Sequence, residues 1–306
     1  MKFKKNRKDM IITIFTPTYN RANTLTRLYE SILKQTNKNF EWLIVDDGSS
    51  DNTEKLVNEW IEESKILISY YKQTNGGKHR AINKGTELAK GELFFIVDSD
   101  DFLPENSIES ICSYYPLLTG NIVGLAGRRQ YPNGKIIGDI FHQDKFVSDH
   151  IEKTYVMGLN GDLSEVVKTD ILREFKFPDF LGEKFCAESL VWNRIGKKYK
   201  IIFTNEVFYY CEYLEGGLSE NSIKNRRKSP HYAMQLYSEL AKDERLPLLI
   251  KIRTYINFWR FSFFSKDSFR SKLSKLDNRF LAIICFPMGW VMKLKDNKIN
   301  KVRINN

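Results

Sequence analysis

Two carboxylates, Asp98 and Asp100, directly follow the hydrophobic stretch 93–97. Carboxylates one residue apart on a turn can bind a hard divalent cation, and Mg²⁺ or Mn²⁺ prefers oxygen ligands shared between a protein and a diphosphate. The pattern alone is common, but its position at the end of an apolar strand makes it more specific. We therefore expect Asp98 and Asp100 to bind a metal ion, with Ser99 beside the nucleotide. The alternative is a carboxylate-rich turn whose Asp101 caps the next helix.

A second group of polar residues lies at 17–21 and 46–47. A rigid proline turn followed by an aromatic ring and an amide can hold a flat base and its ribose. An aspartate at a neighbouring strand end can accept a hydrogen bond from a pyrimidine imide N–H. The nucleotide-binding residues expected here are Pro17, Thr18, Tyr19, Asn20, Arg21 and Asp47. The alternative is that Asn20 or Asn23 only caps the following helix.

A glycine-rich segment with basic side chains covers residues 75–85. Adjacent glycines let the backbone approach a ligand closely, and the amides at the N-terminus of a following helix favour anions. Lys78 and Arg80 add positive charge where a pyrophosphate would lie. The candidate nucleotide-binding residues of this segment are Asn75, Gly76, Lys78, Arg80 and Asn83.

The elements that must position these residues alternate along the first hundred positions. Apolar runs and helical spacing predict strands at 11–15, 40–45, 66–71 and 93–97, and helices at 22–35, 53–63 and 79–89. Further along the chain, two short strands are expected at 199–203 and 208–211. This alternation predicts an α/β fold with a mixed, mainly parallel sheet flanked by helices. Ligands of such sheets bind beyond the carboxyl ends of the strands, where all the polar segments above are expected to meet.

These segments, in their order and spacing over about residues 10–215, resemble glycosyltransferase family 2, the inverting transferases of GT-A fold. The resemblance implies that Pro17 and Tyr19 contact the nucleotide and that Asp47 contacts its uracil. It also implies that Asp100 is the more direct metal ligand of the pair. The implied donor is a UDP-sugar, and the implied cofactor is Mn²⁺ or Mg²⁺.

The chain departs from the family in the glycine-rich segment. Many members carry arginine before the asparagine that matches Asn83, whereas this chain has Ile82. We expect Lys78 or Arg80 to supply the missing positive charge.

An inverting transfer also needs a carboxylate that takes the proton of the acceptor hydroxyl. Members of the family carry Glu-Asp, followed by tryptophan and arginine at fixed spacing. Alignment on Trp192 and Arg194 places Glu188 at the position of that aspartate. Glu188 is therefore the expected base, and Glu183 is the reserve. The alternative is that both residues only begin a helix, expected over 183–196.

The positive charge of the chain is concentrated near its end. The 306 residues carry a net charge of +10, and residues 221–306 contain 19 Lys or Arg against six Asp or Glu. The apolar, aromatic run 280–292 is interrupted by Pro287 and Gly289 and is too short to span a bilayer, but it suits an interfacial position on anionic lipid. The alternative is a helical subdomain that packs its aromatics on the catalytic domain. No nucleic-acid partner is expected, because no recognition motif is present.

The expected organisation is a catalytic domain at 1–220, with the nucleotide-sugar and metal site in 10–105 and the acceptor side in 106–220. A basic helical region follows at 221–306. Four widely spaced cysteines and the lack of a signal-peptide core predict a cytoplasmic protein, peripheral on the cytoplasmic face of the membrane.

The expected function is metal-dependent, inverting transfer from a UDP-sugar to a glycan or lipid-linked acceptor in bacterial cell-surface polysaccharide synthesis. Two alternatives remain from the sequence. One is a sugar-1-phosphate nucleotidyltransferase, although the segment 17–21 does not look like a triphosphate loop. The other is a non-catalytic module that binds glycan or membrane.

Overall fold

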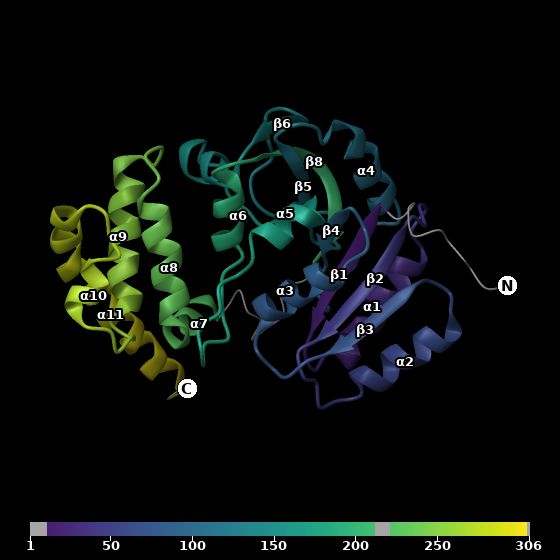
Figure 1. The fold of residues 1–306 in the computed structure, drawn as a ribbon, viewed down its shortest axis with the longest axis horizontal. Coiled ribbons are helices and arrows are strands. Elements are labelled where there is room, and N and C mark those ends of the chain that lie inside the picture. Colours follow the sequence, from purple (N-terminus) through teal and green to yellow (C-terminus); the bar gives the residue numbers. More distant parts are fainter. Residues whose placement is uncertain (1–10, 212–220, 305–306) are drawn as a thin grey trace. The chain divides into compact units, whose positions relative to one another are not determined.

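The computed structural model describes residues 11–211 and 221–304, and the chain packs as two compact units (Figure 1). The first unit falls within residues 1–149, 159–177 and 194–214. The second falls within 150–158, 178–193 and 215–306. The segments 150–158 and 178–193 therefore pack with the C-terminal helices, although they come from the stretch expected to form the catalytic domain.

The first unit is built on a mixed sheet. The described strands form an eight-stranded sheet in the order β3-β2-β1-β4-β7-β5-β8-β6. The pairs β1–β2, β1–β4, β2–β3 and β5–β8 are parallel, and β4–β7, β5–β7 and β6–β8 are antiparallel. The strands are β1 (Ile12–Thr18), β2 (Phe40–Asp46), β3 (Ile68–Lys72), β4 (Leu93–Ile96), β5 (Ile122–Gln130), β6 (Lys145–Ser148), β7 (Leu163–Lys168) and β8 (Lys200–Tyr210). The predicted mixed, mainly parallel sheet is confirmed.

Helices flank this sheet (Figure 1). They are α1 (Ala22–Leu33), α2 (Thr53–Glu63), α3 (Lys78–Leu88), α4 (Ser107–Tyr114), the 3₁₀ turn η1 (Tyr115–Leu117) and α5 (Thr169–Glu174). The helix α6 (Ser189–Gly196) begins in the second unit and ends in the first. The apolar face of α1 is buried, and the rings of Tyr29, Trp42 of β2 and Trp60 of α2 stack against one another. Burial of these rings fixes α1 and α2 on the sheet and thereby sets the loops at the strand ends.

Three local predictions were wrong for tertiary reasons. The helix expected over 183–196 begins only at Ser189, because the carboxylate of Glu183 and the backbone of Phe185 bond to the start of another helix. The two strands expected at 199–203 and 208–211 are one strand, β8, because β5 and β6 pair along both its edges. Asp101 caps no helix: α4 starts at Ser107.

The second unit is helical. It contains the π-helical turn η2 (Glu152–Val156), α7 (Ser222–Lys228), α8 (Pro230–Ala241), α9 (Leu248–Ser262), α10 (Phe269–Leu273) and α11 (Arg279–Ile304). Its core lies between α8, α9 and α11 around Tyr255, Phe258 and Trp259, all fully buried. The expected basic helical C-terminal region is confirmed.

The interruption expected in the run 280–292 is absent, because α11 continues through Pro287. A proline keeps a helical φ and removes one intrahelical hydrogen bond, a loss that packing can offset. Gly289 allows this packing, since a Cβ there would lie 2.4 Å from the Cβ of Trp259. Within 11–211 and 221–304, no helix is both long enough and apolar enough to cross a bilayer.

Candidate functional site

The two carboxylates of the Asp-x-Asp turn lie among basic side chains at the carboxyl end of β4. Lys78 Nζ, at the start of α3, lies 2.5 Å from Asp98 Oδ1. The guanidinium of Arg21, after β1, lies 3.6 Å from Asp100 Oδ2. Because β1 pairs in parallel with β4, their carboxyl ends meet at one sheet edge. The structure thus brings together three segments that are separate in the sequence.

The carboxylate of Asp98 lies close enough to those of Asp100 and Asp101 to shift their pKa values. Burial opposes ionisation of Asp98, but the charges of Lys78 and Arg129 outweigh it and lower its pKa. Burial, followed by repulsion from Asp98, raises the pKa of Asp100. The same two causes raise the pKa of Asp101 to about 7. A bound cation would relieve the repulsion between the carboxylates.

The two carboxylates of the turn fit a metal ion that is also bound by a substrate. Among the residues described, no group of three or more His, Cys, Asp or Glu side chains could hold a metal ion. Asp98 and Asp100 supply two carboxylates, which leaves the other positions around a cation to waters and to oxygens of a second molecule. Mg²⁺ is often held in this way, by one or two carboxylates together with substrate phosphates.

Residues that the sequence analysis missed hold this turn in place. The Tyr209 hydroxyl, from β8, accepts from the Asp98 backbone N–H at 2.7 Å and donates to Asp101 Oδ2 at 2.8 Å. From α1, Arg27 donates to the Asp100 carbonyl at 2.6 Å and Thr24 donates to the Ser99 carbonyl at 3.0 Å. The one sequence signal for Tyr209 is its place in an apolar, aromatic strand, and that pattern normally predicts a core residue.

Asp47 organises the glycine-rich loop. Its Oδ1 accepts from Gln73 Nε2 and from the Gly76 N–H, each at 2.8 Å. Its Oδ2 accepts from the Gly77 N–H at 2.7 Å and from Asn75 Nδ2 at 3.2 Å. These four bonds occupy both carboxylate oxygens, so Asp47 fixes the backbone before α3. A contact between Asp47 and a base stays a prediction.

The segment 17–21 is tied to the loop after β2. The Asn20 N–H donates to Ser49 Oγ at 2.8 Å, and Asn20 Oδ1 accepts from the Ser50 N–H at 2.8 Å. Asn20 therefore does not cap α1, whose N-cap is Arg21 without a side-chain bond. Its positive φ of 52° turns the chain sharply before α1.

Three other predicted nucleotide residues lie in this region. Pro17 and Thr18 form the end of β1, and the buried Thr18 hydroxyl has no hydrogen-bond partner within the described residues. Tyr19 is about half exposed, with a relative accessibility of 49%. An exposed ring beside an unsatisfied hydroxyl is an arrangement suited to a ligand.

Of the remaining residues in the glycine-rich segment, Lys78 contacts the Asp-x-Asp turn, whereas Arg80 and Asn83 bond to backbone elsewhere. The contact of Lys78 with a pyrophosphate stays a prediction. Arg80 turns back toward its own loop and donates to the Gly76 carbonyl. Asn83 uses both amide atoms on the Phe177 backbone, each at 2.9 Å. Of the two charges expected to replace the family's arginine, Lys78 is the one at the turn.

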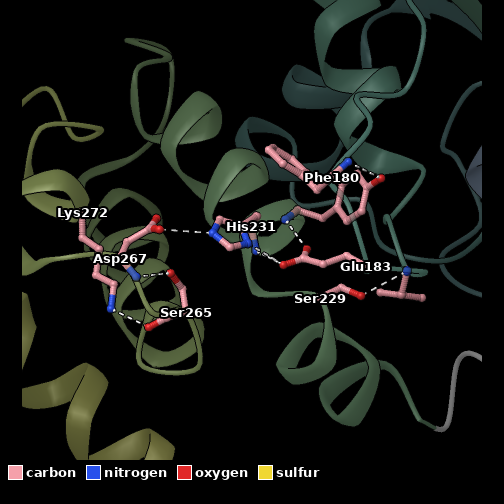
Figure 2. A network of polar contacts seen from close by, with 9 residues as sticks. Phe180, Glu183, Ser229, His231, Ser265, Asp267 and Lys272 are labelled. Atoms are coloured by element: carbon pink, nitrogen blue, oxygen red, sulfur yellow. Dashed lines mark hydrogen bonds and ion pairs between the residues drawn. The ribbon is translucent and has the colours of Figure 1, made fainter.

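The reserve base Glu183 is buried in a polar network of the second unit (Figure 2). Its Oε1 accepts from the His231 N–H at 3.0 Å and contacts His231 Nδ1 at 2.6 Å, and its Oε2 accepts from the Tyr232 N–H at 3.1 Å. His231 Nε2 lies 3.3 Å from Asp267 Oδ1. Glu183 therefore satisfies the free amides at the start of α8.

The expected base Glu188 lies just before α6 and is half-buried. Its carbonyl accepts from the backbone N–H groups of Val191 and Trp192. The carboxylate is thus carried on the first turn of a rigid helix, in the second unit. Its role as a base stays a prediction.

The sheet and the polar segments at its strand ends are those of a GT-A fold, and the comparisons agree. Residues 13–145 match the model of Glycosyl transferase family 2. Over 221 residues the chain is 30% identical to the UDP-Glc:alpha-D-GlcNAc-diphosphoundecaprenol beta-1,3-glucosyltransferase WfgD of Escherichia coli, covering 72% of this chain and 81% of WfgD. The chain therefore belongs to glycosyltransferase family 2, and it is a nucleotide-sugar glycosyltransferase.

Solved structures support the fold. TarS 1-349 of Staphylococcus aureus, in complex with UDP-GlcNAc, superposes with a TM-score of 0.66 at 18% identity, over 94% of this chain and 92% of that one. The mannosyltransferase PcManGT of Pyrobaculum calidifontis, in complex with GDP-Man and Mn²⁺, superposes with a TM-score of 0.55 at 16% identity, over 93% and 87%. The recognition of the family and the predicted fold class are both confirmed.

Proposed function

We propose that this protein transfers a sugar from a UDP-sugar to a hydroxyl of a glycan or lipid-linked acceptor, with inversion at the anomeric carbon and with Mn²⁺ or Mg²⁺. The observation that carries the proposal is the meeting of Asp98, Asp100 and Lys78 at the ends of parallel strands. Two carboxylates and an ammonium at one sheet edge match a cation and a diphosphate.

The donor side follows from the contacts of the site. Asp47 fixes the loop before α3 by accepting from the Gly76 and Gly77 amides, and the N-terminal end of α3 that follows favours anions. Lys78 and Arg21 bring positive charge to the phosphates, and the exposed Tyr19 ring can stack on the base. A cation held by Asp98 and Asp100 would neutralise charge on the departing diphosphate.

The transfer itself needs one proton acceptor. In our proposal the carboxylate of Glu188 takes the proton of the acceptor hydroxyl, and the hydroxyl oxygen forms the new bond to the anomeric carbon. The bond from that carbon to the β-phosphate oxygen breaks, and its electron pair leaves with UDP. Glu183 is the weaker candidate, because its carboxylate already accepts from the start of α8.

The proposed acceptor and setting come from a relative. WfgD is named for a diphosphoundecaprenol-linked acceptor and a UDP-Glc donor. By analogy we propose a lipid-linked or polymeric glycan acceptor in bacterial cell-surface polysaccharide synthesis, at the cytoplasmic face of the membrane.

Nucleotide-dependent thermal stabilisation tests the donor side. We would measure the melting temperature with UDP, GDP, CMP and dTDP, each with and without Mn²⁺, because a ligand that binds the native state stabilises it. We expect stabilisation by UDP that needs the metal and is lost in Asp100→Asn. Preference for another nucleotide would contradict the UDP-sugar donor, and metal-independent stabilisation would contradict the shared cation.

A further inference from the structure

The outward face of α11 is apolar. Opposite its buried face, side chains at helical spacing project into solvent with relative accessibilities between 42% and 76%. They are Phe280, Ile283, Ile284, Met288, Val291 and Leu294. We call these six residues the α11 apolar face. They extend over roughly 20 Å of helix, at 1.5 Å per residue.

The opposite side of α11 already packs in the second unit. Ala282 and Cys285 are buried, and the Ala282 carbonyl accepts from Trp259 Nε1 at 2.7 Å. Packing within the unit therefore does not cover the α11 apolar face. A helix that is apolar on both sides is typical of a helix buried on both sides, so a second apolar surface is expected against this one.

The charges around this face are positive. Exposed basic residues of the same part of the chain are Lys266, Arg270, Arg279 and Lys295. Of the acids in the same part of the chain, Asp296 is buried and pairs with Arg260, Asp267 contacts His231, and the partly exposed Asp277 accepts from Tyr255. The net charge presented near the face therefore favours an anionic partner.

An aromatic residue lies at the border of the face. Trp290 is 44% exposed, packs edge-on against Phe263 and has Lys293 Nζ 4.4 Å from its ring centroid. Tryptophan beside lysine, next to an apolar stripe, is the arrangement that interfacial helices place at the level of lipid headgroups.

We propose that the α11 apolar face inserts in the plane of an anionic lipid bilayer, with the surrounding Lys and Arg residues on the headgroups. An apolar stripe flanked by cations matches acyl chains beneath anionic headgroups. The inference deepens the proposed function, because it names the surface that would bring the protein to a lipid-linked acceptor. Its test uses no turnover, so the two proposals fail separately.

Vesicle co-sedimentation tests the proposal. The full-length protein is mixed with phosphatidylcholine vesicles with or without 30% phosphatidylglycerol. We expect binding that requires the anionic lipid and weakens with salt. The variant Ile283→Ser/Ile284→Ser/Met288→Ser should bind at least tenfold more weakly. The matched control is Leu117→Ser/Ile140→Ser/Val147→Ser, which changes equally exposed apolar residues of the first unit and should bind like the wild type.

Three outcomes would overturn the proposal. One is that the wild type stays in the supernatant with anionic vesicles, and another is that the α11 variant binds as tightly as the control. The third is a dimer, seen by light scattering, that the α11 substitutions dissociate, because a second copy would then cover the face. A cooperative melting transition of each variant without ligand reports whether it is folded, and stabilisation of the wild type by UDP and Mn²⁺ reports separately whether the donor proposal stands.

Discussion

The Tyr209 hydroxyl joins the backbone of Asp98 to a buried acid, because it accepts from the Asp98 N–H at 2.7 Å while donating to Asp101 at 2.8 Å. Tyr209 is fully buried, its ring packs edge-on against Phe95, and Arg129 lies over its face. A side chain from β8 therefore anchors the turn that carries the proposed metal ligands.

Tyr209→Phe should lower both stability and activity. Loss of the hydroxyl leaves the Asp98 N–H and the buried Asp101 carboxylate without this partner, which we expect to cost about 1–3 kcal/mol of unfolding free energy. A shift of the turn should lower kcat/KM by about tenfold or more. Urea unfolding and UDP-release assays measure the two effects. Tyr210→Phe is the control, because the Tyr210 hydroxyl makes no hydrogen bond within the described part of the chain, and a similar loss there would refute the argument.

Asp100→Asn should remove the response to metal. The amide keeps the shape of the side chain but loses the charge that we expect to hold a cation with the diphosphate. Mn²⁺-dependent stabilisation by UDP should disappear, and turnover should fall by about 100-fold or more. Differential scanning fluorimetry and UDP release provide the measurements. Asp170→Asn, at an exposed ion pair with Arg173, should behave like the wild type.

Lys78→Ala should weaken donor binding. The Lys78 ammonium lies 2.5 Å from Asp98 and is the positive charge of α3 at the turn. We expect the KM for the UDP-sugar to rise by about tenfold, corresponding to ~1.4 kcal/mol. Lys84→Ala is the matched control on the same helix, because Lys84 lies over the Tyr71 ring instead. Equal KM values for the two variants would argue against a role of Lys78 in donor binding.

Changing Glu188 or Glu183 to glutamine should have different effects on activity and stability. Glu188→Gln removes the proposed base, so kcat should fall by about 100-fold or more, while UDP-dependent stabilisation is retained. Glu183→Gln replaces a buried carboxylate that accepts two backbone N–H bonds, so its main effect should be a lower melting temperature. Steady-state kinetics and thermal unfolding of both variants distinguish the roles. The reverse pattern would make Glu183 the base.

The His231 network should make stability depend on pH. Burial by itself would lower the pKa of His231, but its hydrogen bonds with Glu183 and Asp267 outweigh burial and raise the pKa above 6.5. The protonated form is therefore favoured in the folded state. Its contribution is fully present below pH 6.5 and is lost as the pH rises through the raised pKa.

Melting temperatures of the wild type and His231→Asn between pH 5.5 and 8.5 measure this contribution. We expect the difference between the two proteins to shrink as the pH rises. The control is His142→Asn, an exposed histidine outside the network. A pH-independent difference would show that the imidazole charge contributes nothing.

Much of the fold was predictable because its signals are local. The helix expected over 53–63 matches α2, and the strands in the first half of the sheet agree within two residues, except that β1 continues three residues beyond its expected end, to Thr18. The pattern of apolar residues determines these elements, since each buries one face on its neighbours. The predictions at 183–188 and at Pro287 were wrong because they used the local pattern alone. At both places, contacts with residues distant in sequence decide the structure.

By itself, the sequence determined the type of fold, the polar segments at the strand ends and their chemistry. The chemistry of these segments follows from their residue types: carboxylates bind cations, while glycine-rich loops and basic residues bind anions. Only the tertiary structure decided which side chains act together: that Tyr209 holds Asp98, that Lys78 rather than Arg80 reaches the turn, and that Glu183 supports α8. These pairings depend on strand order and helix packing, and no spacing along the chain encodes a contact such as that between Tyr209 and Asp98, which lie 111 positions apart.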